Sequence, residues 1–147
     1  MKRSENRKIG PGFWYGVGGH LEPDEINIPY DACLREIQEE TGIGPDEIED
    51  LQMKYIVMRR GSDEIVLNYF FFGRTLTRAV TASDEGTLTW VPESEVLEYH
   101  FFEAIRLTLA HYLETGRQTD GVLVGVVDRA PGSAIQWTPL HDMSQGG

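Results

Sequence analysis

Three glutamates stand at a spacing that suits metal chemistry. Glu36, Glu39 and Glu40 occupy positions i, i+3 and i+4, so on a helix their carboxylates share one face. Carboxylates this close repel one another, and a hard divalent cation removes that repulsion. Mg²⁺ prefers oxygen ligands, keeps several waters and bridges to substrate phosphates. The spacing therefore indicates a magnesium site, against the simpler interpretation of a solvated acidic helix face.

The loop before these glutamates contains two adjacent glycines. Gly18 and Gly19 allow the backbone to turn sharply and to approach a ligand, and an exposed carbonyl there can join a metal shell. Glu25, further along the loop, can accept hydrogen bonds from Arg35 or orient a water at the metal. Cys33 is interpreted as a small buried apolar residue, because nothing in the sequence singles out a histidine partner for it.

A helix over residues 29–41 must carry the glutamates. Pro29 suits its first turn, and Gly42 is a C-terminal stop. Ala32, Cys33 and Ile37 can face the core. An amphipathic helix is expected over 101–115, and the apolar patterning predicts strands over 14–17, 51–60, 64–74, 87–91, 122–127 and 134–138. This mixture predicts one mixed α/β or α+β domain.

Composition limits the classes of function. The chain has 147 residues, 13 Lys+Arg, 24 Asp+Glu and a net charge of −11, which disfavours binding to polymeric nucleic acid. No stretch has the length of a membrane span, and the start has no secretory apolar region. The single cysteine suits a reducing compartment, so a cytoplasmic location is expected. Both a monomer and a homodimer remain open.

The glycine-to-glutamate stretch resembles the Nudix box, in which Gly-x5-Glu-x7-Arg-Glu-x-x-Glu-Glu-x-Gly ends on an apolar residue. The match spans residues 19–43, but nine residues instead of seven separate Glu25 from Arg35, so a two-residue insertion is expected within 26–31. The fixed positions are filled by Gly19, Glu25, Arg35, Glu36, Glu39, Glu40, Gly42 and Ile43.

The resemblance implies a Nudix-type α/β/α sandwich around a mixed central sheet. It implies a hydrolase domain over residues 1–116, a C-terminal β extension over 117–143 packed on the same domain, and a tail over 144–147. Such domains normally open with an apolar strand before a Lys-Arg pair, and here Met1 directly precedes Lys2 and Arg3. Either the start is misassigned, or the late strand at 122–127 covers the open sheet edge.

What is known of the family implies roles for individual residues. Glu39 and Glu40 would be the principal ligands of Mg²⁺, for which Mn²⁺ can substitute, and Glu36 a third ligand or the base. Arg35 would orient the carboxylates, and the Gly18 carbonyl would complete the shell. Residues 83–90 are similar to a segment of MutT-like and oxidised-purine nucleoside triphosphatases, which makes Glu85 a further ligand or base. Arg3 is a candidate contact for a substrate phosphate. Candidate contacts for the nucleobase of the substrate are the aromatic residues Tyr15, Tyr69, Phe71 and Phe102.

The expected substrate is a small nucleotide, cleaved at a pyrophosphate linkage. A (deoxy)nucleoside triphosphate such as 8-oxo-dGTP is favoured, because Met58 and Arg60 stand where ADP-ribose and dinucleoside polyphosphate hydrolases often carry proline and tyrosine. An ADP-ribose or nucleotide-sugar pyrophosphatase is one alternative. A Nudix-fold sensor that binds nucleotide without turnover is the other.

Overall fold

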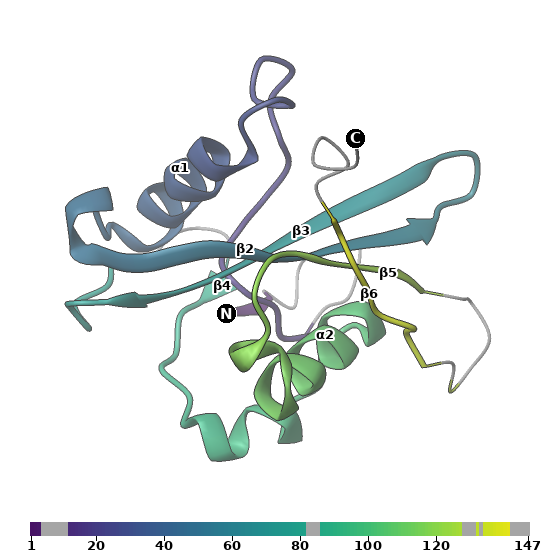
Figure 1. Cartoon of the computed structure of the whole chain (residues 1–147). Helices are drawn as coiled ribbons and strands as arrows, with labels where there is room; N and C mark the ends of the chain where they lie inside the picture. Colours follow the sequence, from purple (N-terminus) through teal and green to yellow (C-terminus); the bar gives the residue numbers. More distant parts are fainter. Residues whose placement is uncertain (4–11, 82–85, 128–131, 133, 142–147) are drawn as a thin grey trace. The chain divides into compact units, whose positions relative to one another are not determined.

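The structure is a computed structural model, and it describes residues 1–3, 12–81, 86–127, 132 and 134–141. The chain divides into two compact units, Met1–Leu51 with Gly73–Arg106, and Gln52–Phe72 with Leu107–Gly147. In chain order the elements are β1 (Lys2–Arg3), α1 (Pro29–Thr41), η1 (Pro45–Glu47), β2 (Ile48–Arg60), β3 (Ile65–Thr75), β4 (Gly86–Thr87), η2 (Glu93–Glu98), α2 (Glu103–Glu114), η3 (Gly116–Gln118), β5 (Leu123–Val127) and β6 (Thr138–Pro139) (Figure 1).

A four-stranded mixed sheet, in the order β3-β2-β5-β6, dominates the fold. The hairpin of β2 and β3 turns at Gly61, whose N–H donates to the Glu64 carbonyl at 2.7 Å. β5 runs parallel to β2, from Tyr55 opposite Leu123 to Arg59 opposite Val127. A late strand therefore covers this side of β2, which was one of the two alternatives for the open sheet edge. The predicted mixed α+β class is confirmed.

The first unit is built around α1, and its local sequence explains both helix ends. Pro29 occupies the first turn, where a missing N–H costs nothing. Gly42 ends the helix with φ 77°, and its N–H donates to the Gln38 carbonyl at 2.8 Å. The predicted bounds are confirmed. Of the residues expected to face the core, Ala32 is buried, while Cys33 and Ile37 are half-buried.

The second unit has a core of large side chains around Tyr55. Tyr55 and Val57 of β2 are fully buried, and so is Thr108 of α2. The Tyr55 hydroxyl lies 2.9 Å from Nδ1 of His111, and burial lowers the pKa of that imidazole. Gly116 lies so close to Tyr55 that an added Cβ would sit 1.6 Å from the hydroxyl oxygen.

Three of the predicted strands are wrong or too long. Residues 14–17 form no strand, and among the described residues Trp14 makes isolated bridges to Lys2 and Phe101 before the chain turns into the glycine loop. The strand predicted over 87–91 is reduced to Gly86–Thr87, which pairs with β1. Within 134–138 only Thr138 is in a strand, where β6 pairs with β5. Alternation of apolar residues alone predicts strands poorly where contacts within loops satisfy the hydrogen-bonding groups of the backbone.

Candidate active site

The acidic side chains of α1 gather at its C-terminal half, where they oppose the helix dipole. Carboxylates are stabilising near a helix N-terminus and unfavourable near the C-terminus. The last turn of α1 contains no basic residue that would offset them. The helix dipole is therefore no reason for Glu39 and Glu40 to be there. Thr41 holds this end in place, since its hydroxyl donates to the Ile37 carbonyl at 2.6 Å and accepts from the Ile43 N–H at 3.1 Å.

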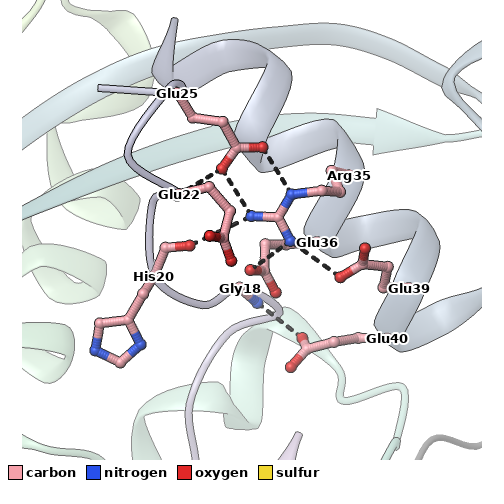
Figure 2. A network of polar contacts seen from close by, with 8 residues as sticks. All are labelled: Gly18, His20, Glu22, Glu25, Arg35, Glu36, Glu39 and Glu40. Atoms are coloured by element: carbon pink, nitrogen blue, oxygen red, sulfur yellow. Dashed lines mark hydrogen bonds and ion pairs between the residues drawn. The ribbon is translucent and has the colours of Figure 1, made fainter. Parts of the chain in front are cut away.

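Arg35 joins the loop to the helix (Figure 2). Its Nε and Nη2 donate to the two carboxylate oxygens of Glu25 at 2.7 and 2.9 Å, a bidentate pair that fixes the plane of the guanidinium. Its Nη1 donates to Glu36 at 2.9 Å and to Glu39 at 3.0 Å. The expected hydrogen bond between Glu25 and Arg35 is therefore present, in spite of the longer loop.

The glycine loop contacts two of the helix carboxylates directly. The Gly18 N–H donates to Oε2 of Glu40 at 2.8 Å, and Glu40 is only 5% exposed. A Cβ at Gly19 would lie 2.5 Å from a carboxylate oxygen of Glu36, closer than real Cβ atoms come. Gly19 is thus required because the loop backbone and the Glu36 carboxylate share one small space. The observed contact of Gly18 is through its N–H, and its carbonyl remains a proposed ligand.

The electrostatics of the network keep its charges in place at neutral pH. Hydrogen bonds from Arg35, and then from the Glu22 N–H, lower the pKa of Glu25 to about 2. The same contacts, Glu25 first and Glu36 second, raise the pKa of Arg35 above its ordinary value. Three carboxylates thus share one guanidinium, and Glu40 lies beside them bonded to a neutral N–H. The cluster retains excess negative charge that a cation can neutralise.

Cys33 on the same helix is poorly suited to nucleophilic chemistry. Burial, followed by the charge of Glu36, raises the pKa of its thiol to about 11. The thiol is therefore protonated at neutral pH, which agrees with its interpretation as an apolar residue.

The donor set fits a hard cation in its chemistry. Its donors are carboxylate and backbone oxygens, which Mg²⁺ prefers over sulfur and nitrogen. Within the described part of the chain, however, no three His, Cys, Asp or Glu side chains are arranged so that they could hold a metal together. Figure 2 shows that Arg35 binds Glu36 and Glu39, and that Gly18 binds Glu40. An ion would share these carboxylates with Arg35 and the loop.

The remaining predicted site residues do not all join this network. Tyr15 exchanges backbone hydrogen bonds with Met1, and Phe102 stacks on Phe13 with ring centroids 4.5 Å apart. Tyr69 and Phe71 lie on β3 in the second compact unit.

Two predicted residues fall outside the described structure. Glu85 lies in the segment 82–85, which the structure does not describe. Arg3 pairs with Gly86 through its backbone, but its side chain is also outside the described part.

Sequence reasoning missed the backbone groups that complete the network. The His20 carbonyl accepts from Nη2 of Arg35 at 3.3 Å, and the Glu22 N–H donates to Glu25 at 2.8 Å. These contacts come from main-chain atoms, which every residue possesses, so no residue type could have indicated them. The adjacent glycines were the available signal that this loop approaches something closely.

The chain belongs to the Nudix family. The model of the NUDIX domain matches residues 1–120, so the match covers most of the chain and includes the whole network described above. Members of this family are pyrophosphohydrolases that act on small nucleotides and generally use divalent metals such as Mg²⁺. The resemblance inferred from the box is thereby confirmed.

A solved structure supports the fold. The crystal structure of the mutator MutT protein from Bacillus halodurans is similar to this chain, with a TM-score of 0.56 and 24% sequence identity. The likeness covers 84% of this chain and 78% of that one. Among the helices that the structure describes, none is long and apolar enough to cross a membrane.

Proposed function

We propose that this protein is a Mg²⁺-dependent nucleotide pyrophosphohydrolase. Its proposed substrate is a (deoxy)nucleoside triphosphate such as 8-oxo-dGTP, cleaved to a nucleoside monophosphate and pyrophosphate, and its proposed location is the cytoplasm. The observation that carries the proposal is that Arg35 binds Glu36 and Glu39 while the glycine loop binds Glu40, all on the same helix. Such an arrangement concentrates negative charge at the helix end where the macrodipole disfavours it.

The proposed roles combine what the family resemblance implies with the contacts that the structure describes. Glu36, Glu39 and Glu40 would hold Mg²⁺, which when bound neutralises phosphate charge and activates water. Arg35 is a positioning residue, because Nη1 of its guanidinium group donates to the carboxylates of both Glu36 and Glu39 and so keeps them close to one another. Glu25 in turn fixes Arg35. Gly18 and Glu85 are further proposed ligands, with Glu85 also a candidate base.

Substrate contacts are proposed from side-chain chemistry. Arg3 offers a positive charge for a phosphate oxygen. Tyr15 and Phe102 offer rings for stacking on a nucleobase, and Tyr69 and Phe71 are further candidates from β3. Phe102 is already stacked on Phe13, so a base at this position would extend an existing stack.

A hydrolysis panel tests the proposal. The purified chain is given the standard dNTPs, 8-oxo-dGTP, ADP-ribose, a nucleotide sugar and a dinucleoside polyphosphate, with and without Mg²⁺, and products are identified by mass. Release of pyrophosphate from one triphosphate, abolished by chelation, is the expected result. Two monophosphates from ADP-ribose would instead indicate the sugar-nucleotide alternative. Tight binding without turnover under any divalent metal would indicate a sensor.

Amide variants separate the metal ligands from the scaffold. Glu39→Gln and Glu40→Gln keep an oxygen that can accept from Arg35 or Gly18 but lose the charge that binds a cation. We expect each to lower kcat/KM about 100-fold or more. Glu95→Gln, an exposed change on η2, is the matched control. Unchanged turnover in both amide variants would refute the assigned roles.

A further inference from the structure

The two outer strands of the four-stranded sheet are protected very differently. β6 at one edge is two residues long and contains Pro139, which has no N–H to offer a further strand. β3 at the other edge is 11 residues long, and no strand is paired beyond it among the residues the structure describes. Long edges of this kind are templates for pairing with another chain.

The first nine residues of β3 carry none of the usual blocks to pairing. Residues 65–73 read Ile-Val-Leu-Asn-Tyr-Phe-Phe-Phe-Gly, with no charged side chain and no proline. Natural edge strands are commonly interrupted by Lys, Pro or inward-pointing charges. Ile65 is 69% exposed and Leu67 is 45% exposed, so apolar surface on one face of this edge remains open to solvent.

Charges flank this apolar stretch with opposite signs. Glu64 precedes it and is exposed, while Arg74 follows it with a side chain that is 73% exposed and bonded to Asp50. In an antiparallel self-pairing centred on Tyr69, Glu64 of each copy lies opposite Arg74 of the other. A two-fold axis repeats this pair, so both ends of the paired strands gain attraction.

The direction of the backbone groups agrees with that register. The Glu64 carbonyl points toward β2, since it accepts from the Gly61 N–H. Carbonyls alternate along a strand, so those of Ile65, Leu67 and Tyr69 point toward the open edge. With Tyr69 opposite its own copy, the outward-facing residues of both strands meet, and Leu67 lies opposite Phe71.

We propose that β3 is the interface of a two-fold symmetric homodimer, in which the β3 strands of two copies pair antiparallel about Tyr69. The two four-stranded sheets then become continuous across the axis. The open apolar edge is covered by an identical edge, and each Glu64 pairs with Arg74 of the second copy.

Sedimentation of the full chain from about 1 to 100 µM tests the dimer. Wild type is expected to dimerise, and Leu67→Lys to weaken association at least about tenfold, because a charged side chain would replace the apolar cross-strand contact with Phe71. Ile65→Lys, at the more exposed position, is a second variant if Leu67→Lys folds poorly by circular dichroism. A wild-type chain that stays monomeric over this range would overturn the proposal.

Charge reversal tests the register. Glu64→Arg and Arg74→Glu each bring like charges together twice per dimer, so each is expected to weaken association about tenfold. Because Arg74 is also bonded to Asp50, the compensating variant combines Glu64→Arg, Arg74→Glu and Asp50→Arg. It restores the opposite-charge pairs within and between the chains and should recover wild-type association. Glu95→Arg, on η2, is the control and should leave association unchanged. Failure of the triple variant to recover, when it folds as the wild type does by circular dichroism, would refute the Glu64–Arg74 register.

A disulfide across the axis gives a direct readout. Directly opposed residues of a hydrogen-bonded antiparallel pair have Cα atoms about 5.5 Å apart, which suits a disulfide. In a Cys33→Ala background, Tyr69→Cys should form a covalent dimer under mild oxidation. Leu67→Cys should form no covalent dimer, because the cysteine of one copy lies opposite Phe71 of the other and the two cysteines are therefore too far apart along the strands. Cross-linking of Leu67→Cys but not of Tyr69→Cys would contradict the register.

Discussion

Replacement of Gly19 by alanine separates the catalytic arrangement from the stability of the fold. The added Cβ would lie 2.5 Å from Oε1 and 2.6 Å from Oε2 of Glu36. These atoms are the far end of a flexible side chain, so the fold survives if the carboxylate moves away. The backbone at Gly19 has no positive φ that would strain an alanine. We therefore expect the free energy of unfolding to change by less than about 1 kcal/mol.

The effect on catalysis follows from the size of that movement. Ordinary contact begins near 3.4 Å, so the Glu36 carboxylate must retreat by roughly 1 Å. That retreat stretches the 2.9 Å hydrogen bond from Arg35 and displaces a proposed metal ligand. A misplacement of about 1 Å can cost 100-fold in rate, so we expect kcat/KM to fall about 100-fold, or about 2.7 kcal/mol in barrier height.

The assay compares two glycines of one loop. Gly16→Ala is the matched control, because a Cβ there meets nothing within 4 Å and the backbone has no positive φ. Both variants are measured by urea unfolding and by Mg²⁺-dependent hydrolysis of the best substrate from the panel. Full activity in Gly19→Ala, with Gly16→Ala also active, would refute the role given to the position of Glu36.

Three further predictions concern stability and reactivity. Gly116→Ala would place a Cβ 1.6 Å from the buried Tyr55 hydroxyl, and should cost about 2 kcal/mol or more in urea unfolding; an unchanged midpoint would contradict the packing. The pKa of Glu25 falls from 4.5 to about 2 on folding, so the unfolded chain takes up this proton first. The stability given by its pair with Arg35 should be complete above about pH 4.5 and lost progressively toward pH 2, and Glu25→Gln should flatten that dependence in urea titrations; equal slopes would refute it. The thiol of Cys33, with its pKa raised from 9 to about 11, should react with an alkylating reagent about 100-fold more slowly at pH 7.5 than in the urea-unfolded chain, and equal rates would refute its burial.

Local sequence rules succeeded where a few neighbouring residues decide the structure. Pro29 and Gly42 predicted both ends of α1, because the requirements of a helix terminus are met within one turn. The spacing of Glu36, Glu39 and Glu40 placed them on one helical face for the same reason. The strands predicted over 51–60 and 64–74 were likewise found as β2 and β3, because each is rich in apolar residues.

The failures lie where distant contacts override local preference. The residues after Trp14 were expected to continue a strand, but the loop instead turns so that the Gly18 N–H reaches Glu40, 22 positions away. Trp90 was placed in a strand, yet it is 50% exposed and its indole N–H donates to the Arg78 carbonyl. Single-residue preferences carry no information about such partners.

The sequence by itself determined the family, the carboxylate helix and the spacing of its glutamates, because these depend on residue types at fixed short distances along the chain. Tertiary structure alone decided that β5 lies parallel beside β2, that Tyr55 meets His111 at a separation of 56 residues, and that the loop backbone closes on Glu36. These contacts involve strand edges, main-chain groups and excluded volume. Such features are set by where distant segments come together, and a one-dimensional pattern does not record them.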